Sequence, residues 1–275
     1  MNGITIDIDP VAFQVGGFAL RWYSLTFGLG ILAAVMLTLR EARRAGLDSD
    51  RVANVAIWAV AAGLVGARLF HVVDKLGYYL DNPFEIVMIN HGGLAIWGGL
   101  FSGGVGALIA AKREGLPLAR LADVTVPGLL VGQMIGRIGC IINGDAYGGA
   151  TSLPWGFIYV NPGAMLPDSL AGVPTHPYPI YEVLWDLALL GGVLTLRRRN
   201  LPVGLLFFLY LGGYAIGRFS LTFVRQEAII LWGLQQAQLV ALLAMGMAVA
   251  GTALSLSRRR PEGSATRRRH LRVTT

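Results

Sequence analysis

The chain has 275 residues, of which 54% are hydrophobic and only 14% are charged, and its mean hydropathy is +0.57. Soluble globular proteins carry roughly a quarter charged residues, so this composition argues against an ordinary soluble domain and indicates a polytopic membrane protein. The single Cys140 excludes an intramolecular disulfide framework, and the Cys and His residues lack the spacing of a zinc site.

The N-terminal MNGITIDIDP has no basic segment before an apolar core, which is not the pattern of a cleavable signal peptide. Seven later stretches have the roughly 20 apolar residues that a helix needs to cross a bilayer. The sequence therefore predicts an all-α polytopic membrane protein, in which residues 1–257 form a single seven-helix domain. We expect the spans at 19–39, 52–72, 92–111, 122–142, 178–196, 202–221 and 234–256.

One long stretch between these spans is not predicted to be helical. Residues 143–177 are rich in Gly and Pro and contain one strand-like run, WGFIYV. We expect a small external head here, between the fourth and fifth helices, joined by the N-terminal runs ITIDI and VAFQV as short strands. The tail at 258–275 is polar, basic and without periodicity, which predicts a disordered cytoplasmic segment.

The formal net charge of +7 is distributed as membrane topology requires. Most of the 23 Lys and Arg residues follow the first, third, fifth and seventh spans, which all face one side of the membrane. The positive-inside rule assigns that side to the cytoplasm, so the N-terminus is expected outside and the C-terminus inside.

The remaining cations lie near the outer ends of their spans: Arg21, Arg68, Lys75, Arg137, Arg218 and Arg225. A charged residue inside a membrane is costly unless it is paired or hydrated, so each one is a functional hypothesis. Two structural alternatives remain open. Arg21 and Arg225 could only extend to the interface, and the deeper arginines could form ion pairs that hold the bundle together. Their possible partners are Glu182, Asp186 and Asp145.

The cations exceed these acids, which leaves positive charge for an anionic ligand. Guanidinium groups suit phosphate in a two-point geometry, and the outer leaflet supplies phospholipid. On the sixth span, Tyr214, Arg218, Thr222 and Arg225 are spaced so that they share one helical face. His91 could be a base or an interfacial residue.

With these residues in view, the chain resembles the bacterial prolipoprotein diacylglyceryl transferases from about Pro10 to the seventh helix. The run GRIGCIINGDAYG at 136–148 is similar to the family signature Gly-Arg-x-Gly-Asn-Phe-x-Asn-x-Glu, followed by a Gly three residues on. The matching residues are Arg137, Gly139, Asn143 and Gly148. Four further blocks resemble family blocks in the same order: LRWYSL, GGLAIWGGL, HPYPIYE and GYAIGRFSLTFVRQ.

Four positions depart from the family pattern. Cys140 stands where the signature usually has Asn, and Asp145 where it has Glu. Trp97 replaces a frequent His or Tyr, and Thr222 a frequent Glu. Asp for Glu keeps the carboxylate, whereas Cys for Asn removes the hydrogen-bonding capacity of an amide. The resemblance therefore implies either a divergent enzyme or a paralogue with another acceptor.

The resemblance implies transfer of a diacylglyceryl group from phosphatidylglycerol to the lipobox cysteine thiol of secreted prolipoproteins, leaving a thioether and glycerol phosphate. Arg137 and Arg218 would stabilise the developing phosphate charge, and Asp145 or His91 would take the thiol proton. Further residues would bind and orient the substrates: Tyr23, Arg68, Asn143, Gly148, Glu182 and Arg225. The reaction needs no metal or organic cofactor.

The expected partners are phosphatidylglycerol, prolipoproteins and membrane lipids, with no nucleic acid, and the expected location is the bacterial inner membrane. The rival from another class is an anionic-solute transporter, which would use the same arginines. Inverted repeats and discontinuous helices would favour that rival, and the sequence shows neither.

Overall fold

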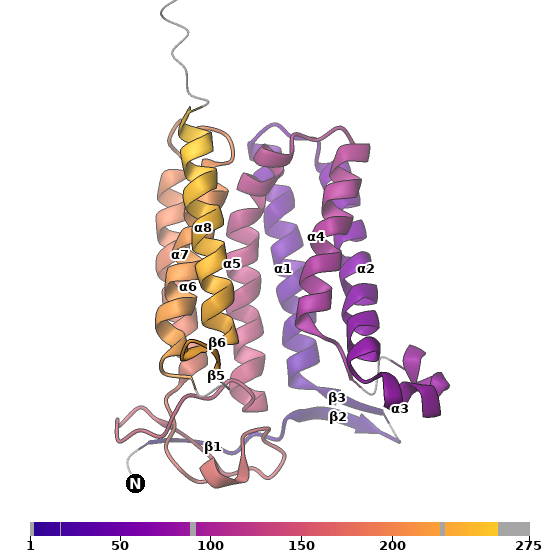
Figure 1. Cartoon of the computed structure of the whole chain (residues 1–275), viewed down its shortest axis with the longest axis vertical. Coiled ribbons are helices and arrows are strands. Elements are labelled where there is room, and N and C mark those ends of the chain that lie inside the picture. Colours follow the sequence, from indigo (N-terminus) through magenta and orange to yellow (C-terminus); the bar gives the residue numbers. More distant parts are fainter. Residues whose placement is uncertain (1–2, 17, 89–91, 226–228, 258–275) are drawn as a thin grey trace, which may run out of the picture.

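The structure, a computed structural model, describes residues 3–16, 18–88, 92–225 and 229–257. Its long helices stand side by side, and the short strands gather at one end of them (Figure 1). We call this the strand end. The long helices are α1 (Trp22–Arg44), α2 (Ser49–Asp74), α4 (Ile96–Arg113), α5 (Leu118–Asn143), α6 (Tyr178–Leu196), α7 (Leu205–Thr222) and α8 (Gln236–Ser257).

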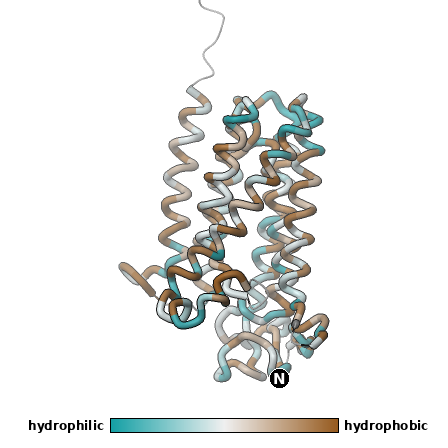
Figure 2. The backbone as a smooth tube through the Cα atoms, turned by 90° about the vertical axis from the view of Figure 1, so that its right-hand side faces the viewer, coloured by the Kyte–Doolittle hydropathy of each residue, from teal (hydrophilic) through white to brown (hydrophobic). Residues whose placement is uncertain are grey.

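Six of these helices are long and apolar enough to cross a membrane, namely α1, α2, α5, α6, α7 and α8. Hydrophobic residues dominate the middle of the bundle, and hydrophilic residues concentrate toward its two ends (Figure 2). The fold is therefore a helical membrane fold, as the composition predicts. The glycine-rich α4 is not among the six, and its last turn carries Lys112 and Arg113.

Several predicted span boundaries differ from the helix ends by a few residues, and at two N-terminal ends the local structure shows why. The first helix begins at Trp22 rather than at residue 19, because residues 18–21 form the strand β3 (Phe18–Arg21). The helix expected from residue 92 begins at Ile96, after two glycines, Gly92 and Gly93, with positive φ. Apolar residues in short strands or turns add to a hydropathy average just as helical ones do, which explains both errors.

The N-terminal strands lie where the chain enters the bundle. The strand β1 (Ile4–Ile6) pairs in parallel with β4 (Phe157–Tyr159), so the ITIDI run joins the 143–177 segment as expected. The VAFQV run forms β2 (Val11–Val15), but it pairs with β3 in a hairpin instead of joining that segment.

Short elements complete the strand end. They are the helices α3 (Leu76–Asp81), η1 (Pro83–Val87) and η3 (Asp168–Leu170), and the strands β5 (Ile229–Leu231) and β6 (Leu234–Gln235). The strands β5 and β6 pair antiparallel between α7 and α8.

Glycines allow α1 and α5 to pack backbone to backbone. A Cβ atom added at Gly132 would lie 2.9 Å from the carbonyl oxygen of Gly30, and one added at Gly30 would lie 2.8 Å from the carbonyl oxygen of Gly132. At Gly128 the nearest atom would be the carbonyl oxygen of Ala34, at 2.4 Å. This close approach brings the end of α5, which carries the family-like signature, against the first turns of α1.

We expect Gly128→Ala to destabilise the fold by about 1–3 kcal/mol, because its methyl group has no space against α1. Gly136→Ala, further along the same helix, is the matched control, since nothing lies within 4 Å of its added Cβ. Reversible unfolding in mixed micelles measures both variants. Equal stability of the two would contradict the close packing of α1 on α5.

Candidate functional site

Three helices bring two arginines onto one carboxylate at the strand end of the bundle. Arg137 of α5 approaches Glu182 of α6 through two atoms, with Nε 2.8 Å from Oε2 and Nη2 2.9 Å from Oε1. Arg218 of α7 donates from Nη1 to Oε1 of Glu182 at 2.6 Å. The Glu182 side chain is 6% exposed, against 21% for Arg137 and 20% for Arg218. One carboxylate thus contacts two guanidinium groups, so the cations outnumber the acid that they contact directly.

Tyr178, which the sequence interpretation does not single out, completes this cluster from the first turn of α6. Its side chain is fully buried, its hydroxyl accepts from Nη1 of Arg218 at 2.8 Å, and it donates to Oε1 of Glu182 at 3.1 Å. The guanidinium carbon atoms of Arg218 and Arg225 lie 5.9 and 5.4 Å from the ring centroid. The position was discoverable, because Tyr178 precedes Glu182 by four residues in the HPYPIYE block.

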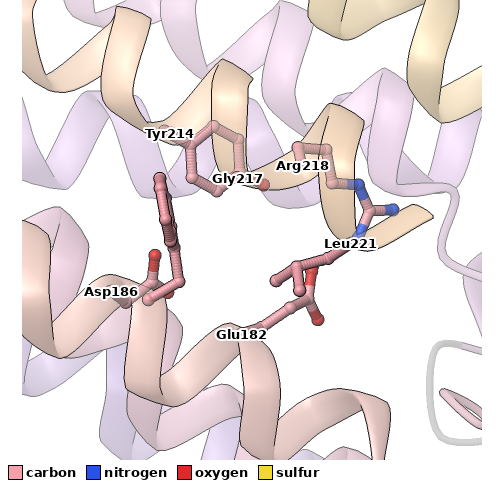
Figure 3. A pocket seen from close by; sticks show the side chains of 7 residues that line it. Glu182, Asp186, Tyr214, Gly217, Arg218 and Leu221 are labelled. Carbon is pink, nitrogen blue, oxygen red and sulfur yellow. The ribbon is translucent and has the colours of Figure 1, made fainter. Parts of the chain in front are cut away.

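A small pocket opens beside the cluster, between α6 and α7 (Figure 3). Asp186 lies one turn from Glu182 on α6, and Tyr214 lies one turn from Arg218 on α7, so both pairs line the same pocket. Trp185 also lines it and donates from Nε1 to the carbonyl oxygen of Gly213 at 2.9 Å. This lining places Tyr214 and Arg218 on one face of α7, as predicted. The helix ends at Thr222, so the prediction that Arg225 shares this helical face is wrong.

The C-terminal end of α5 places further predicted residues close to one another. Asn143 is the last residue of α5, and Gly144 ends the helix with a φ of +73°. Asn143 and Asp145 each have a buried oxygen, Oδ1, with no hydrogen-bond partner among the described residues. Tyr23 of α1 packs against the buried cluster that contains Cys140 and Tyr178. An acceptor is therefore available beside the arginine cluster.

Tyr159 of β4 binds the C-terminal end of α5. Its hydroxyl donates to the carbonyl oxygen of Ile141 at 2.9 Å, and the residue is 2% exposed. Burial raises the pKa of the Tyr159 phenol above its usual range, and the nearby Asp145 and Cys140 add to that rise. The phenol therefore stays protonated and keeps donating to α5.

Gly148 and Arg225, which are both predicted to bind substrate, contact each other through their backbones. The two residues form an isolated antiparallel bridge, and Gly148 N donates to the carbonyl oxygen of His176 at 3.1 Å. A Cβ atom added at Gly148 would lie 2.7 Å from the Cβ of His176. Glycine is required here because the chain segments pack too closely for a side chain.

Arg68 lies apart from the arginine cluster. It belongs to α2, which packs on α4 and α1, whereas the cluster is formed by α5, α6 and α7. Its guanidinium donates to main-chain carbonyl oxygens of the segment after α3, those of Glu85, Ile86, Met88, Gly92 and Gly93. The side chain also lies over the Tyr79 ring, 5.3 Å from its centroid. These contacts fix the segment to α2.

Other positions singled out in the sequence have distinct surroundings. His91 lies outside the described residues. Trp97 is 39% exposed on α4. Thr222 is fully buried, and its hydroxyl donates to the Arg218 carbonyl oxygen. Among the described residues, no group of three or more His, Cys, Asp and Glu side chains could hold a metal ion.

Comparison with known proteins places this geometry in context. Residues 10–254 match the family model described as prolipoprotein diacylglyceryl transferase. The chain is similar to the phosphatidylglycerol–prolipoprotein diacylglyceryl transferase of Clostridioides difficile (strain 630), at 35% identity over 86% of this chain and 91% of the relative. The enzyme of that name from Dehalococcoides mccartyi (strain ATCC BAA-2100 / JCM 16839 / KCTC 5957 / BAV1) is 38% identical, over 89% and 92% of the two chains. The one from Nostoc sp. (strain PCC 7120 / SAG 25.82 / UTEX 2576) is 34% identical, over 92% and 91%.

Proposed function

The chain belongs to the prolipoprotein diacylglyceryl transferase family, and from this premise we propose that it moves the diacylglyceryl group of phosphatidylglycerol to the lipobox cysteine thiol of prolipoproteins. The observation that carries the proposal is the pair of arginines, Arg137 and Arg218, that meets at Glu182 inside an apolar bundle. Guanidinium groups in such a site are suited to hold the phosphate of a phospholipid.

The proposed chemistry is a displacement at the glyceryl carbon that carries the phosphate. The thiol loses its proton, the sulfur forms a bond to that carbon, and the carbon–oxygen bond to phosphate breaks. The electron pair leaves with the phosphate oxygen as glycerol phosphate. Arg137 and Arg218 stabilise the charge that develops on this oxygen, in a setting where little water weakens the interaction.

The other residues support this displacement. Asp145 or His91 accepts the thiol proton, and the unpartnered Oδ1 of Asp145 supports the first choice. Tyr23 and the Oδ1 of Asn143 orient the glycerol head group. Glu182 fixes the positions of both arginines through its ion pairs with them. Arg225 and Gly148 shape one wall of the site through their backbone bridge, whereas Arg68 holds the segment after α3 against α2, apart from the arginine cluster.

We place the strand end outside the cell. In this topology all seven long helices, α4 included, cross the bacterial inner membrane, residues 143–177 form an external head, and the basic tail at 258–275 is cytoplasmic. The charge distribution supports this orientation. The acyl chains then enter sideways from the bilayer, while the precursor arrives from the outer surface.

Labelling of single cysteines tests the topology. In a Cys140→Ala background, we expect Asp168→Cys in the head to react with an impermeant maleimide on intact spheroplasts. Asp50→Cys, at the start of α2, should react only after permeabilisation. Both aspartates are exposed, so accessibility within the protein is matched. Reaction of Asp50→Cys on intact spheroplasts would reverse the assignment.

A reconstituted assay tests the function. Purified protein is mixed with phosphatidylglycerol and a synthetic peptide that carries the lipobox cysteine, and mass spectrometry follows the peptide. The expected product has a diacylglyceryl mass on its cysteine. Lipid binding without any product would instead indicate a paralogue that kept the phosphate site and changed its acceptor.

A further inference from the structure

A tight turn in the 143–177 segment returns the chain to the end of α5. Asn161 shapes the turn, because its Oδ1 accepts from Gly163 N at 2.9 Å and its carbonyl oxygen accepts from Ala164 N at 3.1 Å. The next residue, Met165, donates from its backbone N to the carbonyl oxygen of Asn143 at 2.9 Å. The turn thus brings a methionine onto the last residue of the signature helix.

The sulfur of Met165 meets two donors from separate parts of the chain. The amide nitrogen Nδ2 of Asn143 lies 3.2 Å from Sδ, and Nη1 of Arg21 lies 3.6 Å from it. Arg21 comes from the end of β3, immediately before α1. Two polar groups, one of them charged, therefore converge on one sulfur atom.

A thioether is a poor partner for such donors. Its sulfur is a weak acceptor, whereas both an amide N–H and a guanidinium are strong donors. The same amide has a buried Oδ1 with no partner among the described residues. Asn143 is itself buried, so its amide has little access to water as a substitute. The arrangement is one that a better acceptor would displace.

We propose that Arg21 and the Asn143 amide nitrogen form the binding site for the sulfur of the acceptor cysteine, and that Met165 occupies this site until a precursor displaces it. A cysteine thiolate would put its sulfur atom where the Met165 sulfur lies, and its negative charge makes it a much stronger acceptor than a thioether. A neighbouring cation also favours ionisation of a thiol. This inference rests on the proposed function and deepens it by locating the second substrate.

The location of the Arg21–Asn143 site favours the acceptor thiol, rather than the lipid phosphate, as its ligand. Met165 is 55% exposed and Arg21 is exposed, so the site opens toward the surface from which the precursor arrives. The arginines proposed to hold the phosphate, Arg137 and Arg218, belong to α5 and α7 and meet at another residue, Glu182. Asn143 then serves both substrates, with Nδ2 on the sulfur and Oδ1 on a glycerol hydroxyl.

The proton and the electrons are accounted for in this arrangement. The thiol proton passes to the carboxylate of Asp145, two residues after Asn143. The thiolate, held by Arg21 and Asn143, then forms the sulfur–carbon bond as the carbon–oxygen bond breaks, and the phosphate oxygen keeps that electron pair. Arg21 and Asn143 donate hydrogen bonds throughout and exchange no proton.

The test measures the KM for the lipobox peptide and the KM for phosphatidylglycerol separately, on full-length protein in lipid nanodiscs. We expect Met165→Ala to lower the peptide KM several-fold, because nothing then competes for the donors. Arg21→Gln should raise the peptide KM about tenfold, since a charge-assisted hydrogen bond is lost. In Arg21→Gln, the rising limb of the kcat–pH profile should also move to higher pH, because the bound thiol ionises less readily. Neither variant should change the lipid KM.

Met247→Ala is the matched control, since Met247 is 58% exposed on α8, and it should leave both KM values unchanged. Fluorescence anisotropy of a labelled peptide, with the protein in nanodiscs that lack phosphatidylglycerol, gives a second readout that needs no turnover. Met165→Ala should bind the peptide more tightly. Unchanged peptide KM and peptide affinity in both variants would overturn the inference. So would a change in the lipid KM alone, which would assign Arg21 to the head group. Absence of product from the wild-type chain would instead count against the proposed function.

Discussion

Arg137→Ala should lower the rate of diacylglyceryl transfer by about 10³-fold, because it removes one of the two guanidinium groups proposed to stabilise the phosphate charge. Arg137→Lys keeps the positive charge but not the two-point geometry, so it should recover part of the rate. The measurement is kcat/KM in the reconstituted assay, with product identified by mass spectrometry. The expected loss lies mainly in kcat, since the charge on the leaving oxygen appears during the reaction.

The fold should survive this substitution. In Arg137→Ala, Glu182 still has Arg218 and the Tyr178 hydroxyl as partners, so the buried carboxylate is not left alone. Arg43→Ala is the matched control, because Arg43 is exposed near the end of α1 and its Nε donates within that helix, to the Leu39 carbonyl oxygen. Arg137→Ala with more than a tenth of wild-type activity would remove Arg137 from the chemistry.

Much of this site follows from sequence because membrane energetics restrict polar residues. Arg137, Glu182 and Arg218 stand in spans where charge is costly, so their positions alone require a partner or a ligand for each. The three side chains meet because α5, α6 and α7 are neighbours and because the three residues stand at the same depth in the bundle. Tyr178 escapes the sequence interpretation, although its four-residue offset from Glu182 puts it on the same face of α6.

Other contacts leave no pattern in the sequence. Arg68 is expected near the ligand, but its partners are main-chain carbonyl oxygens after α3. Every residue has a carbonyl oxygen, so the sequence does not reveal which ones an arginine will bind. Met165 reaches Asn143 only through the turn at Asn161, and no periodicity marks it. The strand β2 is predicted correctly, but its partner depends on chain reversal at Gly16, which has a φ of +57°.

Glu182→Ala should be the most destabilising single change in the cluster, at about 3–5 kcal/mol. The substitution leaves Arg137 and Arg218 in an apolar bundle without the carboxylate that they share, and Tyr178 loses its acceptor. Glu182→Gln should cost less, because its amide oxygen still accepts hydrogen bonds although the charge is gone. Reversible unfolding in mixed micelles gives these free energies.

A double-variant cycle separates the ion pair from general packing. If the cost of Glu182→Ala comes from uncompensated arginine charge, adding Arg218→Ala should relieve part of it, so the double variant is more stable than the two single losses predict by addition. Glu114→Ala is the control outside the cluster. The Glu114 carboxylate accepts one hydrogen bond, from Asn54 at 3.3 Å, so its loss should change stability by at most about 0.5 kcal/mol. Strict additivity in the cycle would mean that water already compensates the arginines. Arg137 and Arg218 would then face an aqueous cleft rather than the dry phosphate site that the proposed chemistry needs.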